Sequence, residues 1–368
     1  MDQKARDLVA RSTATGARVT ASDQRTPSLA SETVWWSDTV WARVVRGSLA
    51  PLSLVFRAIT SMRNRLYDAK ILRTISSPVP VVSVGNLSVG GTGKTPVAAY
   101  IVQQLRAAGR CPAIVMRGYG KDETEVHALL NPGIRIYANP DRVAGIARAA
   151  QEGADVIVLD DAFQHRRAGR DADIVLVSAE RWREHEWTLP AGSLREPAQA
   201  LRRATLICVT HRVANPAAVQ RVTNALSKIA PDVPIASLHL GIGILHTITG
   251  TDSTMTLGQL AGAHVLAIAG IGDTRSFFGQ LTEAGAIVDR RPFADHHAYT
   301  PTDVTSILAT AASHKYIIAT LKDAVKLRVM WPAKGPILWY VSQALEVSGG
   351  ASFINSALTN LLPTSRSD

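Results

Sequence analysis

The sequence predicts an α/β fold in which a mostly parallel sheet is followed by a second, smaller α/β unit. From Pro78 onward, short β-branched runs alternate with helical segments, as in crossover connections between parallel strands. A glycine-rich stretch directly after the first run indicates a strand–loop–helix unit. The chain has 368 residues, of which 46% are hydrophobic and 19% charged. It is therefore globular and long enough for two such units.

Composition excludes several classes of protein. The two cysteines, Cys111 and Cys208, are far apart and lack metal-ligand spacing, so we expect no zinc fold and a reducing compartment. A net charge of +10 indicates anionic partners. Aromatic residues make up only 5% of the chain, and no nucleic-acid-binding signature is present, so we expect no nucleic-acid partner.

The N-terminal region differs from the rest of the chain. Residues 1–33 are polar and rich in Ser, Thr, Ala and Arg, which predicts a disordered tail. In residues 34–75, tryptophans and arginines flank an uncharged run over 47–56. This pattern predicts an amphipathic helix, either membrane-associating or packed on its own domain. No run reaches the roughly 18–20 apolar residues of a membrane span and no secretory signal is present, so we expect a cytoplasmic protein that touches a membrane surface.

We expect a core domain over residues 76–240. Its strands are predicted at 79–84, 113–116, 134–137, 156–159, 174–177, 206–209 and 235–238, and its helices at 96–108, 141–152 and 216–229. Near Gly241–Thr251 the chain is expected to change domain. The second unit, residues 241–368, has predicted strands at 265–269, 316–319 and 337–341, and a helix start at Thr300–Asp303.

The glycine-rich stretch predicts a P-loop NTPase-type domain. Glycines allow backbone N–H groups to turn inward around phosphate oxygens. The expected nucleotide-binding residues are Ser88, Val89, Gly90, Gly91, Thr92, Gly93, Lys94 and Thr95. Lys94 can reach the β- and γ-phosphates, and the hydroxyl of Thr95 can bind Mg²⁺. Ser88 replaces the first glycine of the strict motif, and Gly90 and Gly91 can supply the flexibility instead.

Two aspartates, Asp160 and Asp161, follow the predicted strand at 156–159. In a parallel sheet they would emerge at the same edge as the glycine-rich loop. Carboxylates at that edge can bind Mg²⁺ or position water.

Several motifs together resemble those of the tetraacyldisaccharide 4'-kinases of lipid A synthesis. The loop Gly85–Pro96 is similar to the family's phosphate loop, and the resemblance continues in order from about residue 35 to about residue 345. The other matching motifs are Arg117-Gly118-Tyr119-Gly120, Asp160-Asp161-Ala162-Phe163-Gln164-His165, Leu189–Pro197, Ala269–Gly272, Phe293–His297 and Lys322–Val325.

The resemblance implies an ATP-dependent kinase that phosphorylates the 4'-hydroxyl of tetraacyldisaccharide 1-phosphate, giving lipid IVA. It implies ATP and Mg²⁺ as cofactors, a lipid substrate, and peripheral attachment to the cytoplasmic face of the inner membrane; no obligate protein partner is evident. It makes Lys94, Asp122 and His296 catalytic, with Asp122 as the general base assisted by His296. Beside these roles, we expect Thr95 and Asp160 or Asp161, together with Glu196, to hold or orient the metal. Arg117, Tyr119, Gln164 and Arg195 are expected either to line the acceptor site or to be packing residues.

This chain departs from the family at several positions. Ala162 and Leu321 replace a usual glycine and glutamate, and the segment after Gly120 is shortened. Asp122 aligns with the family's base, and Glu123 is the alternative. A P-loop ATPase or GTPase acting as a switch or assembly factor is the alternative function, although the chain shows no Asn-Lys-x-Asp motif. Another alternative is a catalytically divergent relative of the kinase.

Overall fold

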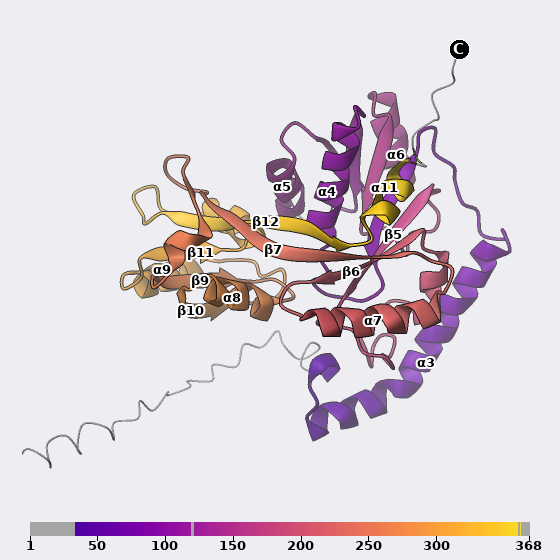
Figure 1. The fold of residues 1–368 in the computed structure, drawn as a ribbon, viewed down its shortest axis with the longest axis horizontal. Coiled ribbons are helices and arrows are strands. Elements are labelled where there is room, and N and C mark those ends of the chain that lie inside the picture. Colours follow the sequence, from indigo (N-terminus) through magenta and orange to yellow (C-terminus); the bar gives the residue numbers. More distant parts are fainter. Residues whose placement is uncertain (1–33, 119–120, 360, 362–368) are drawn as a thin grey trace, which may run out of the picture.

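A computed structural model describes residues 34–118, 121–359 and 361, and it shows one sheet running through both halves of the molecule (Figure 1). The strand order is β10-β9-β11-β12-β7-β6-β5-β1-β4-β2-β3, and β8 pairs with β7. The predicted disordered tail, residues 1–33, lies outside the described residues. The α/β class and the mostly parallel sheet are confirmed.

The first half contains six parallel strands with helices on both faces. Helices α4 and α11 cover one face, and α6, α7 and the 3₁₀ turn η2 cover the other. The strands are β1 (Val81–Asn86), β2 (Pro112–Met116), β3 (Arg135–Ala138), β4 (Val156–Asp160), β5 (Ala172–Ser178) and β6 (Leu206–His211). The helical elements are α4 (Lys94–Ala107), α5 (Lys121–Leu130), α6 (Arg142–Gln151), η2 (Ala198–Arg203) and α7 (Pro216–Ile229).

Two long strands join the halves, β7 (Ile235–Thr247) and β12 (Leu338–Gly349), which pair antiparallel. In Figure 1 they extend from the first half into the second. The predicted change of domain near Gly241–Thr251 therefore begins inside β7. The last helix, α11 (Ala351–Thr359), packs on the core of the first half. A boundary at 240/241 stays a prediction.

The second half surrounds the far ends of these strands. Its other strands are β8 (Thr254–Met255), β9 (His264–Ala269), β10 (Ile287–Pro292) and β11 (Tyr316–Ala319). Its helical elements are η3 (Leu257–Leu260), α8 (Thr274–Glu283), α9 (Pro301–Ala311) and α10 (Leu321–Arg328). The predicted helix start at Thr300–Asp303 is the N-terminus of α9. It forms a capping box, because the hydroxyl of Thr300 accepts from the Asp303 N–H and the Asp303 carboxylate accepts from the Thr300 N–H.

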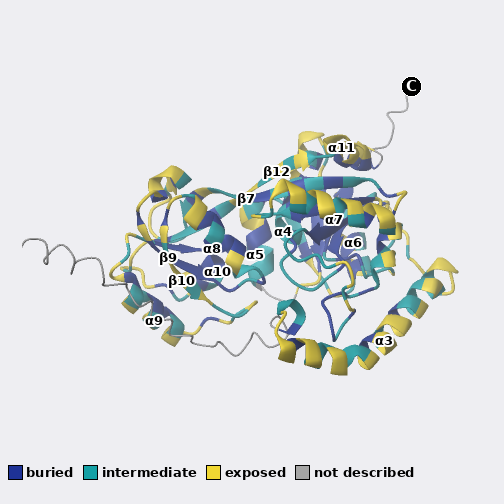
Figure 2. Cartoon of the chain, turned by 60° about the horizontal axis from the view of Figure 1, so that its bottom comes forward, coloured by how far each residue is buried: buried dark blue, intermediate teal, exposed yellow. Residues whose placement is uncertain are grey.

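Helix α3 (Val40–Asp68) confirms the predicted N-terminal amphipathic helix and lies along the edge of the first half. Figure 2 shows much of its surface exposed. The exposed apolar side chains include Val40, Trp41, Val44, Leu52, Val55, Ile59 and Met62. In the described part of the chain, no helix is long and apolar enough to cross a membrane.

Two of the tryptophans that precede α3 do not form part of this exposed surface. The indole N–H of Trp35 donates to the Pro190 carbonyl at 2.9 Å. The ring of Trp36 stacks under the guanidinium of Arg181, 4.3 Å from the ring centre. Both rings are therefore half-buried against the first half, whereas Trp41, inside α3, is exposed.

Candidate active site

The glycine-rich loop connects β1 to α4 and is held at both ends by hydrogen bonds. The buried Asn86 donates through Nδ2 to the Ser88 carbonyl at 2.6 Å and to the Thr92 hydroxyl at 2.9 Å. The N–H of Val89 donates to the Ser193 carbonyl at 2.8 Å. The Thr210 hydroxyl donates to the Thr92 carbonyl at 2.9 Å. The loop is therefore a preformed structure at the N-terminus of α4, where an anion is favoured.

Two glycines in this region cannot be replaced without displacing their neighbours. Gly93 has φ +88°, and a Cβ there would collide with the side chain of Leu240 on β7. A Cβ on Gly85 would lie 2.7 Å from Cβ and 2.8 Å from N of Phe163. Because Gly85 has no Cβ, the loop after β4 that contains Phe163 can approach the end of β1 this closely.

Asp160 ends β4 at the same sheet edge as the loop, as predicted. Its Oδ2 lies 2.9 Å from Nε2 of His127, a fully buried histidine on α5. Burial opposes the charged form of Asp160, but the hydrogen bond from His127 and the nearby charges of His127, Lys94 and Lys322 outweigh it, so its pKa is lowered. Asp160 is therefore an ionised carboxylate inside the site.

Lys94, Asp161 and Arg195 form a second charged group beside the loop. Oδ1 of Asp161 lies 2.8 Å from Arg195 Nη1 and 3.8 Å from Lys94 Nζ. Burial lowers the pKa of Lys94. The negative charge of Asp161 raises this pKa, whereas the positive charges of Arg195 and Lys322 lower it further. The cationic side chains of Lys94, Arg195 and Lys322 thus lie around the carboxylates of Asp160 and Asp161. Such a concentration of positive charge suits a polyanion such as a triphosphate.

The predicted acceptor-site residues divide into three cases. Gln164 donates through Nε2 to the Asn86 carbonyl at 2.9 Å, and Arg195 lies 3.5 Å from its Oε1, so these two are together. Arg117 follows β2 and is exposed. Tyr119 lies outside the described residues.

Glu196, the fourth predicted metal ligand, pairs with residues of α3 and η2. Its Oε1 is 2.8 Å from Arg63 Nη2, and its Oε2 is 2.7 Å from Arg203 Nη1 and 2.9 Å from Asn64 Nδ2. The carboxylate is fully buried, and these contacts connect α3 to η2. The arrangement favours a structural ion-pair network over the predicted metal ligand.

The two predicted acid–base residues lie on different halves. Asp122 is in the first turn of α5, with Oδ2 3.4 Å from Lys326 Nζ on α10. His296 is in the turn after β10, where φ is +58° and its side chain is 59% exposed. No hydrogen bond joins these two side chains within the described residues. Glu123, the alternative base, is half-buried and contributes to the electrostatic environment of Arg142.

The second half contributes a loop that lies against the phosphate loop. A Cβ on Gly272 would lie 3.0 Å from the Gly91 nitrogen. Arg212, after β6, donates to the Gly91 carbonyl at 3.1 Å and lies 3.7 Å from Oδ2 of Asp273. The nucleotide site is therefore bounded by residues of both halves.

Sequence reasoning did not identify His127, Arg212 or Lys322 as site residues. Arg212 follows a predicted strand of the parallel sheet, and its position at the carboxyl edge was a usable signal. His127 has no local signal, because its partner is 33 positions away in the sequence. Lys322 belongs to a matched motif, but its approach to the loop depends on how α10 packs.

The residues present fit a magnesium ion. Oδ1 of Asp160 is buried and has no hydrogen-bond partner among the described residues. Thr95 is the second residue of α4 and belongs to the phosphate-loop motif. One carboxylate and one hydroxyl are a small ligand set, which suits Mg²⁺ because this ion retains waters and binds substrate phosphates. No cluster of three or more His, Cys, Asp or Glu suitable for a metal is present in the described part of the chain.

This geometry defines a phosphate-loop nucleotide-binding protein with charged groups arranged around the expected γ-phosphate. The family described as "Tetraacyldisaccharide-1-P 4'-kinase" matches residues 45–362. The chain belongs to this family, and its class is that of an ATP-dependent kinase of lipid A synthesis.

Individual members of this family are similar to the chain over most of its length. The tetraacyldisaccharide 4'-kinase of Anaeromyxobacter sp. (strain K) is 35% identical, covering 89% of this chain and 94% of the relative. That of Halorhodospira halophila is 38% identical, covering 85% and 91%. The crystal structure of LpxK from Aquifex aeolicus in complex with ATP is similar, with a TM-score of 0.67 and 26% identity over 86% of this chain and 99% of that one. The predicted kinase class and the nucleotide are thereby confirmed, and the switch alternative is not supported.

Proposed function

We propose that this chain transfers the γ-phosphoryl group of ATP to the 4'-hydroxyl of a tetraacylated glucosamine disaccharide 1-phosphate at the surface of the inner membrane. The observation that supports this most strongly is the convergence of Lys94, Arg195 and Lys322 on Asp160 and Asp161 beside a preformed phosphate loop. Family membership supplies the acceptor class.

In the proposed reaction the acceptor oxygen attacks the γ-phosphorus while the bond to the β–γ bridging oxygen breaks, releasing ADP. Asp122 takes the hydroxyl proton, and His296 orients this base or accepts the proton from it. Lys94 and Arg195 neutralise charge on the phosphoryl oxygens. Mg²⁺, when bound by Asp160 and Thr95, supplies further neutralisation of the β- and γ-oxygens.

The remaining roles follow from position. Backbone N–H groups of the loop Ser88–Thr95 would bind the phosphates, apart from those of Val89 and Thr92, which donate to the Ser193 and Gly90 carbonyls. Gln164, Arg117 and Tyr119 would contact the acceptor. Asp161, bound by Arg195, would orient the cations rather than the metal. The loop containing Gly272 would exclude water from the γ-phosphate, since it lies against Gly91.

Peripheral attachment to the cytoplasmic face of the membrane is part of the same proposal. The exposed apolar side chains of α3 suit insertion at headgroup depth, and the acceptor is itself a membrane lipid. The net charge of +10 suits an anionic leaflet.

The test is transfer of labelled γ-phosphate from ATP to purified tetraacyldisaccharide 1-phosphate in detergent micelles. Wild type is compared with Lys94→Ala, Asp122→Ala and Glu123→Ala. We expect transfer by wild type and by Glu123→Ala, and almost none by the other two. ATP hydrolysis without any lipid labelling by wild type would overturn the proposal. Activity in Asp122→Ala but not in Glu123→Ala would move the base to Glu123.

A further inference from the structure

We propose that Lys326 is a positioning residue for phosphoryl transfer, holding Asp122 of α5 against the turn that contains His296. The inference rests on the proposed role of Asp122 and extends it. It assigns a function to a lysine on α10 that lies outside the phosphate loop and outside the charged group around Asp161.

One ammonium group contacts both sides of the proposed acid–base pair. Lys326 Nζ lies 3.4 Å from Oδ2 of Asp122 and donates to the His297 carbonyl at 3.3 Å. The side chains of Lys326 and Asp122 are only 16% and 20% exposed, so solvent screens their attraction incompletely. A lysine suits this position because its three N–H donors can serve a carboxylate and a carbonyl together.

The turn with His296 needs such an anchor. His296 has a left-handed backbone and an exposed side chain, so the backbone on either side of it determines where the imidazole points. His297 is fixed on one side, because its Nε2 lies 3.1 Å from Oδ2 of Asp303 and its ring packs 4.8 Å from that of Phe293. Its carbonyl is fixed on the other side by Lys326.

Helix α10 can hold this lysine in place because its N-terminal turn is itself fixed. The buried Asp323 accepts the Gly270 N–H at 2.9 Å and the Tyr299 hydroxyl at 3.0 Å. Leu321 and Val325 pack against Val126 of α5. The helix therefore connects the loop of the second half, the turn with His296 and the helix with Asp122.

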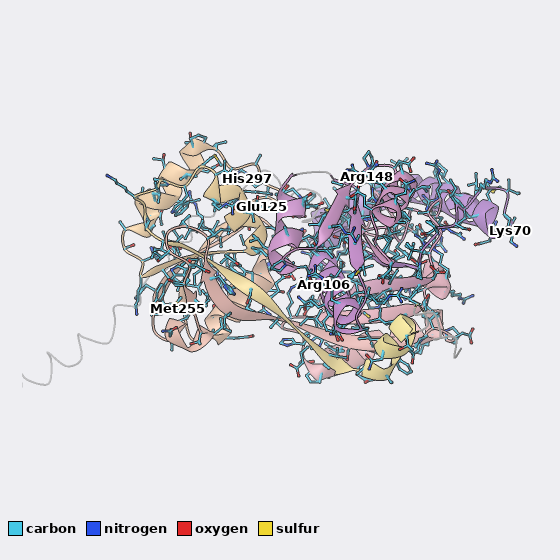
Figure 3. The ribbon with its side chains drawn as sticks, turned by 90° about the horizontal axis from the view of Figure 1, so that it is seen from above. Lys70, Arg106, Glu125, Arg148, Met255 and His297 are labelled. Atoms are coloured by element: carbon cyan, nitrogen blue, oxygen red, sulfur yellow. The ribbon has the colours of Figure 1, made fainter. Side chains whose placement is uncertain are left out.

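The same two helices share a second ion pair, which provides a matched control. Arg328 pairs with Glu125, and neither residue contacts Asp122 in the described structure. In the view of Figure 3, the labels of Glu125 on α5 and of His297 both lie where the two halves meet. A purely structural role for Lys326 would be shared by Arg328, whereas a positioning role would not.

The experiment measures kcat and KM for lipid phosphorylation in Lys326→Met, Lys326→Arg and Arg328→Met. Methionine keeps the length of the side chain and removes the charge. We expect Lys326→Met to lower kcat roughly ten- to hundredfold, the cost of a small displacement of a catalytic group, with KM for ATP nearly unchanged. We expect Lys326→Arg to recover most of kcat and Arg328→Met to retain the wild-type value. Equal losses in Lys326→Met and Arg328→Met would overturn the inference.

A double-mutant cycle separates this inference from the proposed function. If Lys326 acts through Asp122, Lys326→Met will have no further effect in an Asp122→Asn background. A loss of kcat that persists unchanged in that background would refute the positioning role. If Asp122→Asn is impaired and Lys326→Met is not, the inference alone fails. If Asp122→Asn transfers phosphate at the wild-type rate, the assignment of the base fails and the inference falls with it.

Discussion

The Nε2 of His127 lies 2.9 Å from Oδ2 of Asp160, and both side chains are buried at the carboxyl edge of the sheet. The other oxygen of Asp160 has no partner among the described residues. The histidine thus fixes one oxygen of the carboxylate and leaves the other available for a ligand. Residues that orient a metal-binding carboxylate in this way affect both metal affinity and stability.

Replacing His127 should test this relationship. We expect His127→Leu to lose about 1–3 kcal/mol of stability, because the buried Asp160 loses its donor. We also expect it to need about tenfold more Mg²⁺ for half-maximal phosphate transfer. His127→Gln, which retains an N–H donor, should be closer to wild type in both respects. Chemical denaturation and Mg²⁺ titration provide the measurements, and equal Mg²⁺ requirements in all three proteins would contradict the expectation.

Glu196 should behave differently from Asp160. Its oxygens are bound by Arg63, Arg203 and Asn64, so Glu196→Gln leaves two arginines without their counter-charge. We expect a loss of about 3 kcal/mol, moderated by the partial exposure of Arg63, with an unchanged Mg²⁺ requirement. The same denaturation and titration experiments apply. A raised Mg²⁺ requirement without loss of stability would instead support the metal role predicted from the sequence.

The strands and the phosphate loop could be predicted because their signals are local. Strands of the first half are short, continuous apolar runs, since both faces of the sheet are covered. Strand β10 was missed because it is an exposed edge strand with the sequence Ile-Val-Asp-Arg-Arg-Pro, which has no such run. β7 and β12 are longer than predicted because their remaining parts are not continuous apolar runs. The rest of β7 contains half-buried Gly and His residues, and the rest of β12 contains polar residues at partly exposed positions.

The site could be predicted only where its residues follow strands or belong to a matched motif. Asp160 and Asp161 meet both conditions, and Lys94 belongs to the matched phosphate loop. The contacts of His127 with Asp160 and of Lys326 with Asp122 depend on how α5 packs between the sheet and α10. Such pairings arise from tertiary packing, and no spacing within the sequence encodes them.

A substitution at Gly85 tests the close approach between β1 and the loop after β4. Gly85→Ala would place a methyl group 2.7 Å from Cβ of Phe163, so we expect a loss of about 1–3 kcal/mol and weaker ATP binding. Gly47→Ala is the control, because it lies in α3 and a Cβ there meets no atom within 4 Å. It should be stabilised by roughly 0.5–1 kcal/mol. Thermal or urea denaturation measures the stability of both variants. Equal stability in the two would contradict the steric explanation.

Glu180 should make stability depend on pH. Its carboxylate accepts the N–H groups of Arg212 and of the next two residues, and the hydroxyl of Ser178. Burial would raise the pKa of Glu180, but these hydrogen bonds lower it below its ordinary value of 4.5. Because the unfolded chain then binds the proton more readily, this contribution is complete above about pH 4.5 and disappears as the pH falls through the folded-state pKa.

We therefore expect Glu180→Gln to lose about 1.5–3 kcal/mol at pH 7. The difference from wild type should shrink when urea denaturation is repeated near pH 4. ATP binding should also weaken, because Glu180 supports the loop that presents Arg212 to Gly91. A difference in stability that is the same at both pH values would show that the charge of Glu180 is not the cause.

Helix α3 has two surfaces that predict how the protein meets a lipid bilayer. Trp41, Val55 and Ile59 belong to an exposed apolar stripe, each more than half exposed. On another face of the helix, Arg57 and Arg65 border a groove of about 430 Å³ between α3 and η2. The stripe should supply affinity for any bilayer, whereas the groove should respond only to anionic lipid.

Vesicle sedimentation distinguishes the two contributions. Changing Trp41, Val55 and Ile59 together to serine should weaken binding on the order of a hundredfold, at about 1 kcal/mol for each side chain, whatever the lipid charge. Arg57→Gln with Arg65→Gln should weaken binding about tenfold, only with anionic vesicles and only at low salt. Both variants should retain phosphate transfer in detergent micelles, because neither surface contacts the phosphate loop. Vesicle binding that survives the serine substitutions would show that α3 does not carry the membrane contact.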